Sequence, residues 1–354
     1  MFEKKREKKE SIRGIFDGEI PDEIPLNIEL GVPEIEAQYG DIVNISCRIS
    51  HFRKFYQTGG PFKRTEISVR KWAKGFDIHT YEWPDAKEIV RTLREQITDT
   101  VKRFDNRFII CKVLGPTETA EAFCASGQDK EARHLGQVQH NFDFSMLSFL
   151  NLESAAKLHR RISAYIRECI RAIGSLAEVD AIRIADDAFD YHGLLYPKDF
   201  METAYLPSHE ILANLIHNVG KYSIIHCDGN ILLLNFAKRL SDHYDGFHPL
   251  DLLSRITRKD TQNWIRSLKE ARNILPESVF FTGIPIELIY DPRISIEELG
   301  DVCRKVILTL GKRFLVLNTT HRPFPGSSIE TRGAKEKLQS IRKLLQKKED
   351  VNVS

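Results

Sequence analysis

The sequence predicts an α/β fold, a (β/α)8 TIM barrel. Two observations carry this prediction. Eight short apolar segments typical of strands alternate with helical segments over most of the 354 residues, a length that such barrels commonly reach. The sequence also lacks the G-x-G-x-x-G and P-loop patterns, one of which we would expect after the first strand of an open doubly wound sheet.

The expected strands are rich in Val, Ile, Leu and Phe, and most end at a glycine, a proline or a polar residue. We place them at 25–30, near 76–81, and at 108–114, 179–185, 222–226, 244–248, 279–282 and 313–317. Between most of them, periodic apolar positions predict helices. These helices are expected at about 85–104, from 117, and at 152–176, 197–205, 208–218, 232–240, 264–274, 295–310 and 331–348.

Local signals fix several of these boundaries. Gly115-Pro116 stops the strand at 108–114, and Pro207 separates the two helices at 197–205 and 208–218. Asp85 with Glu88, and Ser295 with Glu298, have the spacing of capping boxes that open helices.

The chain divides into a charged N-terminal extension, residues 1–17, and a single barrel domain, residues 18–348. The first ten residues contain five basic and three acidic side chains, so we expect them to be solvated. Residues 31–84 are rich in charge and aromatic residues, and we interpret them as an insertion around the strand near 76–81.

Composition excludes several classes of function. A net charge of +2 does not favour nucleic acid or a membrane surface, and no apolar run approaches the roughly 20 residues that span a bilayer. Six scattered cysteines without a C-x-x-C pair argue against a disulfide framework. We therefore expect a cytoplasmic protein.

Polar side chains follow many of the predicted strands. In a (β/α)8 barrel the carboxyl ends of the strands form the active-site rim. We therefore expect a site among these residues: Glu29, Asp186, Asp187, His226, Asp228, His248, Thr282 and His321. The alternative for the stretch 226–229 is a simple Asp-Gly turn beside a structural histidine.

Each candidate has a role and an alternative. His226 and Asp228 lie two residues apart and can share a face, as a metal site or an acid/base pair requires. Asp186 and Asp187 are candidates for general acid/base catalysis or for orienting His226, and the alternative is that they bind loop amides. The remaining candidates are His248 as a catalytic residue and Glu29, Tyr191 and His192 as substrate contacts.

Several stretches occur together in the order of a known family. They lie at 20–25, 115–116, 179–187, 193–200, 205–207, 225–231 (Ile-His-Cys-Asp-Gly-Asn-Ile), 246–250, 317–321 and 328–330. In these stretches, over about residues 18 to 340, the chain resembles the uroporphyrinogen decarboxylase superfamily, and in particular its branch of cobalamin- and corrinoid-linked methyltransferases. The resemblance implies a barrel of the uroporphyrinogen decarboxylase type.

The resemblance also distinguishes between branches. The decarboxylases have an Arg-Gln-Ala-Gly-Arg-Tyr stretch near the first strand, whose arginines bind substrate carboxylates. The corresponding residues 26–33, Leu-Asn-Ile-Glu-Leu-Gly-Val-Pro, contain no arginine. A porphyrinogen with many carboxylates needs such cations, so this departure argues against that substrate.

In the methyltransferase branch, zinc is bound by a His-x-Cys at the fifth strand and a Cys at the eighth. The corresponding positions here are His226, Asp228 and His321. The resemblance therefore implies a zinc site in which a carboxylate and an imidazole replace two thiolates, a donor set that suits an oxygen substrate. The alternative is a metal-free site in which His321 contacts the substrate.

The resemblance thus implies a methyltransferase that moves a methyl group between a small substrate, such as a methoxylated compound, and a corrinoid. The expected cofactors are zinc and a corrinoid, carried by a partner protein or present as free cobalamin. The expected partners are a corrinoid protein and a small molecule, and a homodimer is left open. The alternatives are a metal-independent decarboxylase of a smaller acid and a non-catalytic barrel that binds a corrinoid or a metabolite.

Overall fold

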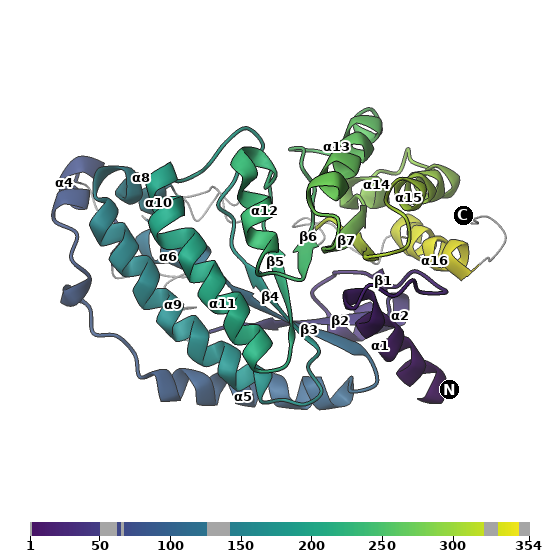
Figure 1. Ribbon diagram of the computed structural model, residues 1–354, viewed down its shortest axis with the longest axis horizontal. Helices are drawn as coiled ribbons and strands as arrows, with labels where there is room; N and C mark the ends of the chain where they lie inside the picture. Colours follow the sequence, from purple (N-terminus) through teal and green to yellow (C-terminus); the bar gives the residue numbers. More distant parts are fainter. Residues whose placement is uncertain (1, 50–61, 65–66, 126–141, 322–331, 347–354) are drawn as a thin grey trace.

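Parallel strands and surrounding helices form the molecule (Figure 1). The structure is a computed structural model that describes all residues except 1, 50–61, 65–66, 126–141, 322–331 and 347–354. Within the described residues, eight strands form one sheet in the order β1-β8-β7-β6-β5-β4-β3-β2, and every pair of neighbours is parallel. The sheet is a nearly closed barrel, which confirms the predicted (β/α)8 fold.

Seven of the eight predicted strands are found close to their expected places. The strands are β1 (Leu26–Asn27), β2 (Ile42–Cys47), β3 (Phe108–Leu114), β4 (Ala181–Ala185), β5 (Tyr222–His226), β6 (Gly246–His248), β7 (Val279–Ile284) and β8 (Leu315–Thr319).

The strand expected near 76–81 is wrong, and β2 takes its place in the barrel. Residues 78–80 form a short 3₁₀ helix, η1 (Ile78–Thr80), between the side chains of Phe76 and Tyr81. The ring of Phe76 lies 4.9 Å from that of Phe62, and the ring of Tyr81 lies 5.1 Å from that of Trp83. Aromatic packing, rather than strand pairing, therefore explains the apolar residues there. The barrel strand of the segment 31–84 therefore lies at 42–47 and not near 76–81.

Side chains close the seam between β1 and β2. The Asp41 carboxylate accepts a hydrogen bond from the Leu26 backbone N–H at 3.0 Å. The buried Glu36 carboxylate accepts from the N–H groups of Leu30, Gly31 and Asn44 at 2.8 Å each. These carboxylates accept hydrogen bonds from backbone N–H groups that would otherwise need the carbonyl groups of a neighbouring strand.

Helices cover the outside of the barrel. They are α1 (Phe2–Phe16), α2 (Pro33–Tyr39), α4 (Val69–Lys74), α5 (Ala86–Arg103), α6 (Pro116–Cys124), α8 (Asp143–Leu150), α9 (Leu152–Gly174), α10 (Lys198–Phe200), η2 (Met201–Tyr205), α11 (Leu206–Asn218), η3 (Leu233–Asn235), α12 (Phe236–Ser241), α13 (Thr261–Ile274), α14 (Ile286–Tyr290), α15 (Ile296–Leu310) and α16 (Arg332–Gln346).

The predicted helix signals are confirmed in part. Ser295 and Glu298 form the expected capping box, whereas Asp85 caps α5 by accepting from the Lys87 N–H. The expected break at Pro207 is wrong. Pro207 lies in the first turn of α11, and the preceding π-turn η2 accommodates this proline, which has no N–H to donate to the turn before it. The π-turn η2 joins this helix directly to α10. The expected end of the domain at residue 348 lies outside the described residues.

The N-terminal segment is a helix that packs against the barrel, not a solvated extension. Ile12 and Ile15 of α1 are buried in the apolar cluster at the amino ends of the strands. The ring of Phe16 stacks on Tyr222 at 4.1 Å, and Lys9 forms an ion pair with the buried Asp180 at 3.0 Å. The segment therefore packs through one apolar face, although its many charged residues are typical of a free extension.

The barrel interior changes from apolar to polar along its axis. On β3, Phe108 and Ile110 belong to the apolar cluster at the amino end, and Lys112 follows on the same face. On β5, Ile224 is followed in the same way by His226. The polar half of the interior therefore faces the carboxyl ends of the strands, where the predicted site lies.

Candidate active site at the carboxyl ends of the strands

Residues from four strand ends meet at this rim. Asp187 follows β4, Asp228 follows β5, Asp251 follows β6 and His321 follows β8. His226, the last residue of β5, contributes from below them, and it is paired in register with His248 of β6. The structure therefore brings Asp187, His226, Asp228 and His321 of the predicted set together and adds Asp251, which sequence reasoning missed.

Asp228 lies at the centre of two overlapping groups of metal-ligand side chains. One group is Asp187, His226 and Asp228, and the other is Asp228, Asp251 and His321. Within each group the candidate ligand atoms all lie within 4.8 Å of one another. The predicted set of His226, Asp228 and His321 is thus divided between two groups that share its carboxylate.

The distances around Asp228 suit a cation between the side chains. Its Oδ1 atom lies 3.4 Å from His226 Nε2 and 3.7 Å from His321 Nε2. This oxygen is buried and has no hydrogen-bond partner among the described residues. Burial, and then the neighbouring charge of Asp187, raise the pKa of the Asp228 carboxyl well above its usual range. A carboxylate in this position calls for a positive charge beside it.

Asp251 is fixed by the backbone and directed at His321. Its Oδ1 accepts from the N–H groups of Gly229 at 3.2 Å and Leu252 at 2.9 Å. Its Oδ2 lies 3.5 Å from His321 Nε2 and accepts the Tyr191 hydroxyl at 2.6 Å. Its place three residues after a strand end, in His-Pro-Leu-Asp, is the signal that could have identified it from the sequence.

His321 carries a positive charge beside the carboxylates of the rim. Burial opposes its protonation, but the hydrogen bond to Asp251 and the charges of Asp228 and Asp251 raise the pKa of His321 to about 9. The protonated His321 therefore partly balances the negative charge of the surrounding carboxylates.

His248 lies beneath His226 rather than at the open rim. The two Nδ1 atoms are 2.5 Å apart, and the rings are stacked at 4.8 Å. The Nε2 atom of His248 lies 2.8 Å from Asn318 Nδ2 and 3.6 Å from Glu29 Oε2. Burial lowers the pKa of both His226 and His248 well below the usual histidine value, so both rings are neutral. A neutral His226 is the form that binds a metal.

Glu29, expected to contact substrate, forms a buried ion pair inside the barrel. Its Oε2 lies 2.7 Å from Arg183 Nη2, and its Oε1 lies 3.7 Å from Lys112 Nζ. The exposed fractions of Arg183 and Glu29 are 0% and 1%. This placement makes Glu29 part of the support beneath the histidines.

The two predicted aspartates after β4 differ in their surroundings. Asp186 is fully buried, and its carboxylate accepts from the N–H groups of Thr117 and Glu118 at 3.2 and 2.8 Å and contacts His209 at 2.9 Å. This is the structural alternative foreseen for it, since these contacts hold the first turn of α6. Asp187 points to the rim, where its Oδ1 accepts the Asp228 N–H at 2.8 Å.

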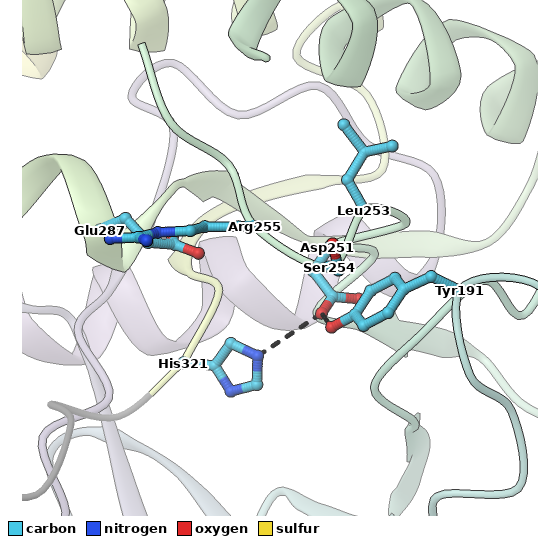
Figure 2. A pocket seen from close by; sticks show the side chains of 7 residues that line it. All are labelled: Tyr191, Asp251, Leu253, Ser254, Arg255, Glu287 and His321. Carbon is cyan, nitrogen blue, oxygen red and sulfur yellow. Dashed lines mark hydrogen bonds and ion pairs between the residues drawn. The ribbon is translucent and has the colours of Figure 1, made fainter. Parts of the chain in front are cut away.

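Tyr191 and His192 also differ. Tyr191 lines a cavity of about 430 Å³ with Asp251, Leu253, Ser254, Arg255, Glu287 and His321 (Figure 2). Figure 2 shows His321 directed at Asp251, with Arg255 and Glu287 on another side of the cavity. His192 is exposed, and its backbone N–H donates to Asp190. The structure therefore brings Tyr191, but not His192, to the cavity.

The donor set fits a metal. Neutral imidazoles and carboxylates are ordinary ligands of zinc and of other first-row divalent cations, and a metal that binds His321 would displace its proton. The buried Oδ1 of Asp228, which accepts no hydrogen bond from the described residues, is an acceptor that a cation would satisfy. Cys227 provides no thiolate here, because its Sγ is buried and accepts the Ala188 N–H at 3.5 Å.

Comparisons with known proteins identify the fold. No family description and no curated protein matches the sequence. A methyltransferase from Methanosarcina mazei matches in structure with a TM-score of 0.57 and 12% identity, covering 96% of this chain and 98% of that chain. The chain has the fold of that methyltransferase. This agrees with the barrel type that the resemblance implied.

A further structure matches less well. A B12-independent methionine synthase from Shewanella sp. W3-18-1 has a TM-score of 0.45 and 16% identity, covering 75% of this chain and 67% of that chain. At these identities, structural similarity establishes the fold and not the activity.

In the described part of the chain, no helix is long and apolar enough to cross a membrane.

Proposed function

We propose that this protein is a metal-dependent methyltransferase that moves a methyl group between a small oxygen-containing substrate and the cobalt of a corrinoid. The observation that carries the proposal is the Asp228 carboxylate, which lies between His226 and His321 and whose Oδ1 has no hydrogen-bond partner among the described residues. The barrel shared with the Methanosarcina mazei methyltransferase supports methyl transfer as the reaction.

Asp228 would hold zinc, with His226 and His321 as the nitrogen donors. Zinc bound there would act as a Lewis acid that polarises a substrate oxygen and lowers its pKa. The absence of thiolate donors leaves the metal harder than in a site with two cysteines, which favours an oxygen substrate over a thiol. A methoxylated compound is the substrate class that fits this chemistry.

The surrounding residues would orient the substrate and the ligands. Tyr191 and Asp251 line the cavity beside His321, and the Tyr191 hydroxyl donates to Asp251 at 2.6 Å. This pair fixes one wall of the cavity, while His248 holds the ring of His226 from below. The open rim above them is where a corrinoid, free or carried by a partner protein, would approach.

The test is a spectral assay with cobalamin. Zinc-loaded protein is mixed with reduced cobalamin and a methoxylated aromatic compound, and formation of methylcobalamin is followed by absorbance. We expect activity that chelation removes and zinc restores, and a loss of roughly 100-fold in Asp228→Asn. The rim variant Asp190→Asn, outside both ligand groups, serves as the control.

The same preparation tests the alternative. Release of carbon dioxide from small carboxylic acids by chelator-treated protein, without any methyl transfer, would contradict the proposal and favour a metal-independent decarboxylase.

A further inference from the structure

The five ligand side chains at the rim exceed what one metal ion needs. A catalytic zinc ion takes three protein ligands and keeps one open position. Here Asp187 and His226 form one group with Asp228, and Asp251 and His321 form another with it. Besides Asp228, each group contains one carboxylate and one imidazole, and only Asp228 belongs to both groups.

From this arrangement we propose that the rim binds two divalent cations bridged by the Asp228 carboxylate. The inference rests on the proposed metal site and adds a second ion to it. One ion is held by Asp187, His226 and Asp228, and the other by Asp228, Asp251 and His321. In two-metal sites the ions generally lie about 3.5–4 Å apart, a separation that one bridging carboxylate spans.

The two outer carboxylates both accept backbone N–H groups. Asp187 uses Oδ1 to accept the Asp228 N–H at 2.8 Å. Asp251 uses Oδ1 to accept the N–H groups of Gly229 and Leu252. In Asp251 this leaves Oδ2 directed at His321 Nε2, 3.5 Å away. Backbone donors thus orient both outer carboxylates before any ion binds, as hydrogen bonds to metal ligands generally do.

The bridging position also has the required acceptor. Asp228 Oδ1 is the atom approached by both imidazoles, and it has no hydrogen-bond partner among the residues that the structure describes. With two cations bound, each imidazole would coordinate its own ion, and the Asp228 carboxylate would lie between the two ions. The donors are nitrogen and oxygen only, so manganese, iron, cobalt and zinc are the fitting ions.

Manganese binding to the full-length protein tests the inference. The protein is stripped with a chelator and titrated with Mn²⁺. Bound metal is measured by equilibrium dialysis, and the spin state by electron paramagnetic resonance. We expect two equivalents and an exchange-coupled spectrum. Asp187→Asn and Asp251→Asn should each retain one equivalent with an uncoupled spectrum, whereas the control Asp190→Asn should retain two.

Each contrary outcome has a defined meaning. Binding of one equivalent by the wild type, or of two equivalents whose coupling survives Asp228→Asn, would overturn the bridged pair. One equivalent together with intact methyl transfer would reject only the second ion and leave the proposed function standing. Two coupled ions without methyl transfer would reject the function and leave this inference. If one outer variant does not fold, the other decides.

Discussion

The Nδ1 atoms of His226 and His248 lie 2.5 Å apart, so one ring donates a hydrogen bond to the other. When His226 carries its proton on Nδ1, its Nε2 lone pair faces Asp228 and can bind a metal. When His248 donates instead, His226 Nε2 carries the proton and donates toward Asp228. His248 therefore decides, through its own partners, which form of His226 is present.

We predict that His248→Gln weakens zinc binding roughly 10- to 100-fold, because the variant loses the imidazole that contacts His226 Nδ1 at 2.5 Å and holds its ring in place. Competition with a chromophoric chelator measures the affinity. His192→Gln, which alters an exposed histidine away from the cavity, should bind zinc like the wild type. An unchanged affinity in His248→Gln would show that this histidine does not position His226.

We predict that Glu29→Gln destabilises the fold by about 3–5 kcal/mol, because it leaves the buried Arg183 without its charge partner. Urea unfolding followed by circular dichroism gives the free energy of unfolding. The matched control is Glu95→Gln, which breaks the exposed pair with Arg91 and should change the value by less than about 0.5 kcal/mol. Equal effects in the two variants would refute the role assigned to the buried pair.

Glu121 gives a prediction for pH dependence. Burial raises the pKa of Glu121 to about 8, although the hydrogen bond from the Tyr196 hydroxyl at 2.7 Å lowers this pKa. Between the ordinary value of 4.5 and about 8, the folded state therefore holds a proton that the unfolded state has released. The stability that this carboxyl contributes is complete below that window and is lost as pH rises through it.

We therefore predict that Glu121→Gln gains stability relative to the wild type as pH rises from 5 to 8, at up to about 1.4 kcal/mol per pH unit. Thermal unfolding of both proteins across this pH range measures the difference. A difference that stays constant with pH would contradict a buried, protonated Glu121.

The strand pattern was sufficient to predict the barrel, but not all of its strands. β2 was missed because Asn44 and Ser46 interrupt its apolar residues, and Asn44 is buried in hydrogen bonds to Asn27 and Glu36. Short-range pattern cannot distinguish such an inward polar residue from a surface one. The aromatic residues around η1 led to the opposite error, because their pattern predicts a strand where none forms.

The candidate site was predictable where residues end strands and hard to predict where they follow in loops. His226, Asp228 and His321 were found because strand ends point to one rim. Asp251 was missed because the loop that directs it at His321 has no regular period. The pairing of Arg183 with Glu29 was not predictable from the sequence, because the two residues meet only across the interior of the closed barrel.

The zinc content of the purified protein tests the central claim most directly. Full-length wild type, dialysed against zinc and then against buffer, should retain at least one equivalent by elemental analysis. Asp228→Asn, with its fold verified by circular dichroism, should retain below about one-fifth of an equivalent. Wild-type zinc below that level, or the same content in Asp228→Asn and the wild type, would contradict a metal-dependent active site centred on Asp228.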